Sequence, residues 1–255
     1  RRRVLNLLEC QRHAMLMYTS CGWFFDEISG IETIQIMKYA ARVIQLIRDV
    51  FGVDLEKRFL EKLAAAKSNV PACGDGARIY EEEIKPSYVD LVKVGVHYAI
   101  SSIFNRTEPG PSKVYCYNVN DEAYFSSRSG RQVLVTGRSR ITSEITLDEQ
   151  RISYAVLWLG DHNLFGGARV FVNEEAFKSM CESVTIPFKK GEIHRTIAVI
   201  DDLFTKDHCT PCTLKNLFKD KQIAISKVIS ELALKKAISR YHEIYDESLP
   251  VMLFL

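Results

Sequence analysis

The order of apolar and polar residues divides the chain into a helical first part, a β-rich middle and a helical end. In the first part, apolar side chains recur at helical spacing along four stretches. Gly22 and Gly52 are placed to end the first two helices, and Asp54 is placed to begin the third. The predicted helices cover residues 4–19, 31–51, 55–63 and 89–103.

The period of the pattern changes from helical to two after Pro109-Gly110-Pro111, a sequence that does not continue a helix. Five stretches rich in β-branched and aromatic residues follow, namely residues 114–119, 122–127, 133–145, 152–159 and 168–172. Their short connections predict an antiparallel meander, since parallel strands need long crossovers. Polar residues alternate with apolar ones in residues 131–146, which predicts that one face of the sheet meets water.

From Asn173 onward the pattern is helical again, with apolar stripes in residues 193–204 and in a long last helix over residues 214–245. The predicted class is α+β: an N-terminal helical layer, a central antiparallel sheet and C-terminal helices. The corresponding segments are residues 1–110, 111–172 and 173–255, which we expect to form one compact unit. A helical pattern already under way at Val4 and an apolar tail over residues 251–255 predict a piece of a longer protein.

Composition narrows the class of protein without naming a function. The 255 residues are 47% hydrophobic and 26% charged with a net charge of +2, so no global charge attracts nucleic acid. No apolar run reaches the roughly 18 residues of a membrane-spanning helix, and polar residues interrupt any signal-peptide core. The seven cysteines are odd in number and mostly set in apolar runs, which favours reduced thiols in a cytoplasmic protein.

The most unusual stretch is Tyr18-Thr19-Ser20-Cys21-Gly22-Trp23-Phe24-Phe25-Asp26-Glu27, where three aromatics precede two carboxylates. Aromatic faces stack on the C–H surfaces of sugars, and carboxylates accept hydrogen bonds from their hydroxyl groups. The alternative is that the aromatics fill the core of a helical hairpin while Asp26 or Glu27 caps the next helix. On chemistry alone packing is favoured, because large aromatics usually serve packing.

Three segments carry a family resemblance: residues 8–33, which contain TSCGWFFDEISGIET, residues 159–164 (Leu-Gly-Asp-His-Asn-Leu) and residues 214–222. Together they span nearly the whole chain. They resemble an uncharacterised domain found C-terminal to the catalytic barrel in bacterial proteins of glycoside hydrolase family 57 type, which are alpha-amylase-like or alpha-mannosidase-like.

The resemblance implies an accessory domain that completes a substrate cleft and stabilises a barrel lying outside this chain. In that family both catalytic carboxylates come from barrel strands, so no catalytic residue is expected here. The implied substrate-binding residues are Trp23, Phe25, Asp26 and Glu27, and the implied partners are the barrel and an oligo- or polysaccharide. Better-known members have an aspartate immediately before the tryptophan, where this chain has Gly22. The alternative function is a structural or protein-interaction domain that never touches sugar.

Asp161-His162-Asn163 lies between two predicted strands. Because Asp and Asn are common turn residues, a tight turn is the simpler interpretation. The functional alternative is a polar cluster that lines the same substrate cleft. No second ligand stands near His162 at the spacing of a metal site.

His208-Cys209-Thr210-Pro211-Cys212 contains a Cys-x-x-Cys pair. A structural zinc site usually has a second pair, and a thioredoxin-like motif lies in a βαβ unit; the sequence shows neither. A loop before the last helix is the simpler interpretation. We therefore expect no metal and no cofactor.

Overall fold

The computed structural model describes residues 1–105, 111–204, 210–211 and 219–252. The chain divides into two compact units, which are described separately. Unit 1 consists of Arg1–Asp90 and Ser143–Asp148, and unit 2 consists of Leu91–Thr142 and Glu149–Leu255. The division falls at Asp90, whereas the sequence pattern placed the end of the helical region at residue 110.

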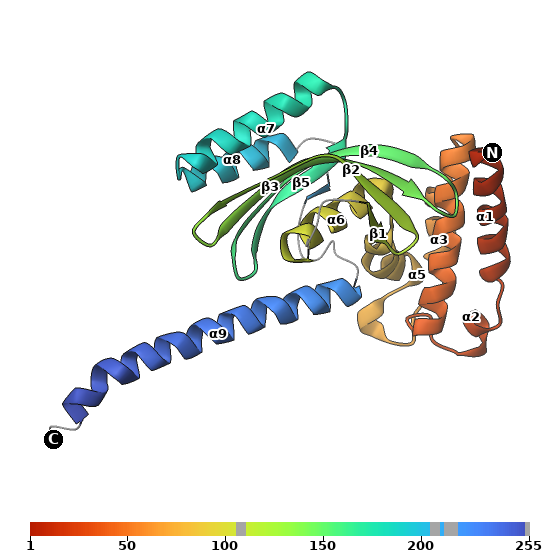
Figure 1. The fold of residues 1–255 in the computed structure, drawn as a ribbon. Helices are drawn as coiled ribbons and strands as arrows, with labels where there is room; N and C mark the ends of the chain where they lie inside the picture. Colours follow the sequence, from red (N-terminus) through yellow and green to blue (C-terminus); the bar gives the residue numbers. More distant parts are fainter. Residues whose placement is uncertain (106–110, 205–209, 212–218, 253–255) are drawn as a thin grey trace. The chain divides into compact units, whose positions relative to one another are not determined.

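Unit 1 is built from helices (Figure 1). They are α1 (Arg2–Leu16), α2 (Cys21–Phe24), α3 (Ile31–Phe51), α4 (Glu56–Leu63) and α5 (Gly76–Ile79), followed by a short π-helix, Tyr80–Ile84, and a 3-10 helix, Lys85–Ser87. The middle of the apolar stripe of α3 is buried, as its spacing predicts, whereas Ile31 and Phe51 at its ends are exposed. Met37 and Ala41 pack there against Ile79, Tyr80 and Ile84. Gly52 ends α3 with φ +69°, as expected of a glycine cap.

Gly22 does not end the first helix, which stops at Leu16. Gly22 lies inside the one-turn helix α2, and a Cβ there would come within 2.6 Å of Ile36 Cγ1 on α3. The glycine is required by this close approach of α2 to α3 rather than by a turn.

Unit 2 contains an antiparallel sheet in the order β1-β2-β3-β4-β5-β6, with neighbouring strands consecutive in sequence. The strands are β1 (Ser112–Val114), β2 (Tyr117–Ser129), β3 (Gln132–Ser143), β4 (Glu149–Gly160), β5 (Asn163–Val170) and β6 (Thr210–Pro211). The predicted meander and the α+β class are confirmed. Short connections join β1 through β5, as at Gly130, whose φ is +58°, whereas α7 and α8 lie between β5 and β6.

Helices cover both faces of this sheet (Figure 1). On one face α6 (Leu91–Asn105) packs against β4, and Gly95 brings it so close that a Cβ would lie 2.9 Å from Ile152. On the other face α7 (Glu174–Lys189) and α8 (Ile193–Phe204) cover Leu134, Ala155 and Leu157. The predicted wet face is therefore wrong where α7 and α8 cover the strand, since Leu134 and Thr136 are buried there and Arg138 pairs with Glu174. It is right farther along β3, where the side chain of Arg140 is exposed.

The last described helix, α9 (Lys219–Met252), is long, as predicted. Its first turns pack in unit 2, where Ile225 and Ile229 are 1% and 2% exposed and α9 contacts α6. Farther along, Leu234 and Tyr241 are exposed. Of the helices in the described ranges, none is both long and apolar enough to cross a bilayer.

The burial pattern of unit 2 predicts that replacing two different leucines will have different effects on the free energy of unfolding. Leu157 is fully buried between β3, α7 and α8, whereas Leu234 is 61% exposed on α9. Leu157→Ala should lower the free energy of unfolding by about 2–5 kcal/mol, since it removes buried methyl groups and leaves a cavity. Leu234→Ala is the matched control and should change it by about 0.5 kcal/mol or less. Denaturant unfolding measures both; equal losses would contradict the assignment of this core.

Candidate functional site

The aromatic residues around α2 lie on the surface of unit 1. Gly22 holds α2 against Ile36, and the chain becomes extended at Phe25, with φ −101° and ψ 148°. Trp23, Phe24 and Phe25 are consequently 72%, 78% and 51% exposed. The rings of Phe24 and Phe25 meet edge to face, with centroids 5.2 Å apart. We call Trp23, Phe24 and Phe25 the aromatic platform.

This exposure separates the two interpretations of the aromatic stretch. A core role for Trp23, Phe24 and Phe25 is wrong within this chain, because more than half of each side chain is open to solvent. Three adjacent exposed aromatics form the kind of patch that marks a binding surface. Neither Asp26 nor Glu27 caps α3, whose N-cap is Gly30.

Glu27 holds the segment after the platform in place. Its Oε1 accepts hydrogen bonds from Ser29 N at 2.7 Å and Ser68 Oγ at 2.6 Å. Its Oε2 accepts one from Asn69 N at 2.7 Å, and Asn69 Nδ2 donates to the main-chain oxygen of Asp26 at 2.6 Å. The donors at Ser68 and Ser29 lower the pKa of Glu27 from 4.5 to about 2. Glu27 is therefore an ionised tether, while the exposed side chain of Asp26 is the carboxylate left on the surface beside the platform.

An apolar cavity of about 260 Å³ lies beside α2 in unit 1. Tyr18 from the segment before α2 and Ile28 from the segment after it both line the cavity, and so does Ile36, the residue against which Gly22 packs. The other lining residues are Met17, Thr33, Met37, Ala40, Phe59, Leu63, Ala66 and Gly76. Ile36 of α3 therefore both contacts Gly22 beneath the platform and lines this cavity.

Asp161 and His162 form the turn between β4 and β5, since Gly160 pairs with Asn163 in the sheet. The tight-turn interpretation is confirmed. Asp161 adopts φ +51°, a left-handed conformation that Asp tolerates better than most residues, and Trp158 Nε1 donates to its main-chain oxygen at 2.9 Å. All three residues of the predicted cluster are exposed. They belong to unit 2, and Trp23 belongs to unit 1.

The described cysteines Cys10, Cys21, Cys73, Cys116 and Cys181 are free thiols. In the ranges that the structure covers, no three His, Cys, Asp or Glu side chains gather in a way that could hold a metal ion. The residues His208, Cys209 and Cys212 lie outside the described residues, so the prediction that this pair binds no metal stays a prediction.

Comparison with known protein families identifies the family of this chain. The family model of DUF3536, a domain of unknown function, matches residues 1–218. The chain belongs to the DUF3536 family. Neither the curated proteins nor the solved structures gave a match. The matched region includes the whole of unit 1 and the sheet of unit 2, so the aromatic platform lies within the family's domain.

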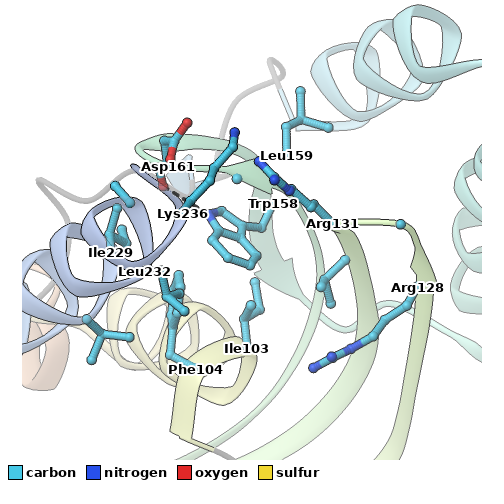
Figure 2. Close-up of a pocket in the computed structure, with 15 residues that line it drawn as sticks. Ile103, Phe104, Arg128, Arg131, Trp158, Leu159, Asp161, Ile229, Leu232 and Lys236 are labelled. Carbon is cyan, nitrogen blue, oxygen red and sulfur yellow. Dashed lines mark hydrogen bonds between the residues drawn. The ribbon is translucent and has the colours of Figure 1, made fainter. Parts of the chain in front are cut away.

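Sequence reasoning missed a second cavity of this DUF3536 chain. It lies in unit 2, measures about 560 Å³ and is lined by Trp158, Phe104, Arg128, Arg131 and Lys236 among others (Figure 2). The pattern of β4 indicates that Trp158 shares a face with Val156 and Tyr154. It does not indicate that residues from α6 and α9, far away in the sequence, surround that tryptophan.

The tether at Glu27 predicts a pH-dependent stability. Because the pKa of Glu27 falls from 4.5 to about 2 on folding, its contribution is complete above about pH 4.5 and is lost as the pH falls through about 2. Glu27→Gln should lower the denaturant midpoint at neutral pH, and the difference from the wild type should shrink toward pH 2. Denaturant unfolding across this pH range measures it. Glu61→Gln on α4 is the control, since Glu61 is exposed and has no hydrogen bond to the described residues. A pH-independent effect of Glu27→Gln would contradict the assignment.

Proposed function

We propose that this DUF3536 chain is an accessory carbohydrate-contacting domain of a glycoside hydrolase family 57-like protein, alpha-amylase-like or alpha-mannosidase-like. In this proposal it borders the substrate cleft of a catalytic barrel outside the chain and stabilises that barrel. The observation that carries the proposal is the exposed aromatic platform of Trp23, Phe24 and Phe25. The resemblance of residues 8–33 to the domain that lies C-terminal to the catalytic barrel in such proteins supports it.

The platform has the properties that sugar contact requires. Indole and phenyl faces offer apolar area to the C–H face of a pyranose ring, and the exposed carboxylate of Asp26 offers acceptors to hydroxyl groups. The platform is also held before any ligand arrives. The contact of Gly22 with Ile36 fixes α2, and the hydrogen bonds of Glu27 fix the chain that follows. A preorganised surface loses less conformational entropy on binding.

The carboxylates beside the platform do not suit catalysis. A retaining glycosidase needs a nucleophile and a protonated acid about 5 Å apart. With a pKa of about 2, Glu27 is ionised at neutral pH, and both of its oxygens already accept hydrogen bonds. Only Asp26 remains, so this surface lacks the pair of carboxylates. These properties favour binding over hydrolysis.

A protein-interaction role is the second candidate, and a feature of α9 favours it. One face of α9 carries Ile225 and Ile229, which are buried. At helical spacing the opposite face carries a second apolar stripe that is exposed. It consists of Ile223, Leu234, Ile238, Tyr241 and Tyr245. Such a stripe suits contact with another folded partner, for which the proposed barrel is one choice.

Substitution of the platform separates sugar contact from scaffolding. Trp23→Ala should change the free energy of unfolding of this chain by less than about 1 kcal/mol, because the side chain is 72% exposed. In the protein that includes the barrel, the same change should weaken binding of a malto-oligosaccharide about tenfold or more, measured by calorimetry. Phe125→Ala, an exposed aromatic of β2, is the control and should leave binding unchanged. A stability loss of about 3–5 kcal/mol, typical of aromatic core residues, would instead show that Trp23 serves packing.

The chain alone should show no glycosidase turnover. The physical reason is that the platform presents one available carboxylate instead of the pair that a glycosidase needs. Incubation of the purified chain with starch and with an aryl glycoside, followed by a reducing-sugar assay, checks this expectation. Steady release that disappears when Asp26 is replaced by Asn would overturn it.

A further inference from the structure

The second cavity, in unit 2, is lined by residues from five elements, namely α6, β2, β3, β4 and α9. Ile103 and Phe104 come from the end of α6, and Arg128 and Arg131 flank the turn between β2 and β3. Trp158, Leu159 and Asp161 come from the end of β4 and its turn, and Ile229, Leu232 and Lys236 come from α9. Its volume of about 560 Å³ lies within the range of about 300–1,000 Å³ that is usual for small-molecule sites.

An aromatic pair forms the apolar part of the cavity. The rings of Phe104 and Trp158 meet edge to face with centroids 5.1 Å apart. The hydrogen bond from Trp158 Nε1 to the main-chain oxygen of Asp161 fixes the indole in its plane. Figure 2 shows this indole in the middle of the lining residues, with Ile229 and Leu232 of α9 to one side. Trp158 is only partly buried, so ring surface is open to a flat ligand.

Three cations surround this aromatic pair: Arg128, Arg131 and Lys236. Elsewhere on the same sheet, Arg140 and Arg151 both pair with Glu122. Arg128, Arg131 and Lys236 make no ion pair with any residue in the described ranges. Asp161 is the one carboxylate in the lining, which therefore carries a net charge of about +2. Lys236 is partly buried although its neighbours on α9 are exposed, so it leans into the cavity.

We propose that this cavity binds a small aromatic phosphate with the chemistry of a nucleoside monophosphate. The ring stacks on Trp158, and the phosphate lies beside Arg131 and Lys236, whose charged ends lie on the same side of the indole (Figure 2). An arginine fork matches the oxygens of a phosphate, and lysine adds a point charge. A phosphate monoester carries a charge of about −2 at neutral pH, which balances the lining. The site belongs to unit 2 and is independent of the platform proposed to contact sugar.

Calorimetric titration of the purified chain with AMP, adenosine and inorganic phosphate tests this site. We expect AMP to bind with one site per chain, and adenosine and phosphate to bind at least tenfold more weakly. Lys236→Met and Arg131→Gln should each weaken AMP binding at least tenfold. Lys227→Met is the matched control, because Lys227 lies exposed on the same helix outside the cavity, and it should leave the affinity unchanged. Circular dichroism verifies that each variant is folded.

Fluorescence gives a second readout that depends on the ring contact. In a Trp23→Phe background Trp158 is the only tryptophan, since the chain has two. AMP should then change its emission with the same midpoint as the calorimetric titration, and Lys236→Met should shift that midpoint at least tenfold. Three results would each overturn the proposal: no binding of AMP at millimolar concentration, adenosine binding as tightly as AMP, or equal losses in Lys236→Met and Lys227→Met. None of them bears on the proposed sugar contact, which Trp23→Ala tests separately.

Discussion

Strand β4 is buried on both of its faces, and the organisation of unit 2 depends on this constraint. Residues Ile152 to Leu157 are all at most 3% exposed, because α6 covers one face and α7 with α8 cover the other. Every polar group on these faces must then find a partner inside the protein. The sheet meets this requirement in two ways, with a hydroxyl network on one face and an ion-pair network on the other.

On the α6 face, Tyr154 is fully buried, and its neighbour across the ladder is Gly137. A Cβ at Gly137 would lie 2.4 Å from the hydroxyl of Tyr154, so the glycine makes room for the ring. The hydroxyl of Ser139 donates to Asp121 Oδ1 at 2.5 Å and is hydrogen-bonded to the hydroxyl of Tyr154 at 3.2 Å. On the other face, Glu122 forms ion pairs with Arg138 of β3 and Arg151 of β4. The guanidinium groups of both arginines also pack against the ring of Phe171. These arginines are therefore structural, unlike those at the second cavity.

The two candidate sites differ in whether neighbouring or distant parts of the sequence form them. The aromatic platform depends on local chain geometry, since Gly22, Glu27 and their partners all lie within residues 22–69 of unit 1. The cavity at Trp158 depends on five elements, whose lining residues are spread over residues 103–236. The first site offers exposed rings with one available carboxylate, and the second offers a partly enclosed ring with three cations. Their chemistry favours neutral sugars at the first and an aromatic anion at the second.

The sequence by itself determined many of the longer elements of this protein, because each of these rests on a short-range pattern. The stripe of α3, the cap at Gly52, the meander with its short turns and the turn at Asp161 follow from neighbours a few residues apart. The pattern also located the unusual aromatic run at Trp23, but not its exposure, because a large aromatic suits a core and a surface equally well. Only the tertiary structure decided that helices cover both faces of the sheet, that Glu27 tethers a distant loop, and that Trp158 lies among three cations. Each of these arrangements brings together residues that are far apart in sequence. Such contacts form because they bury apolar surface, and they leave no periodic pattern in the local sequence from which they could be predicted.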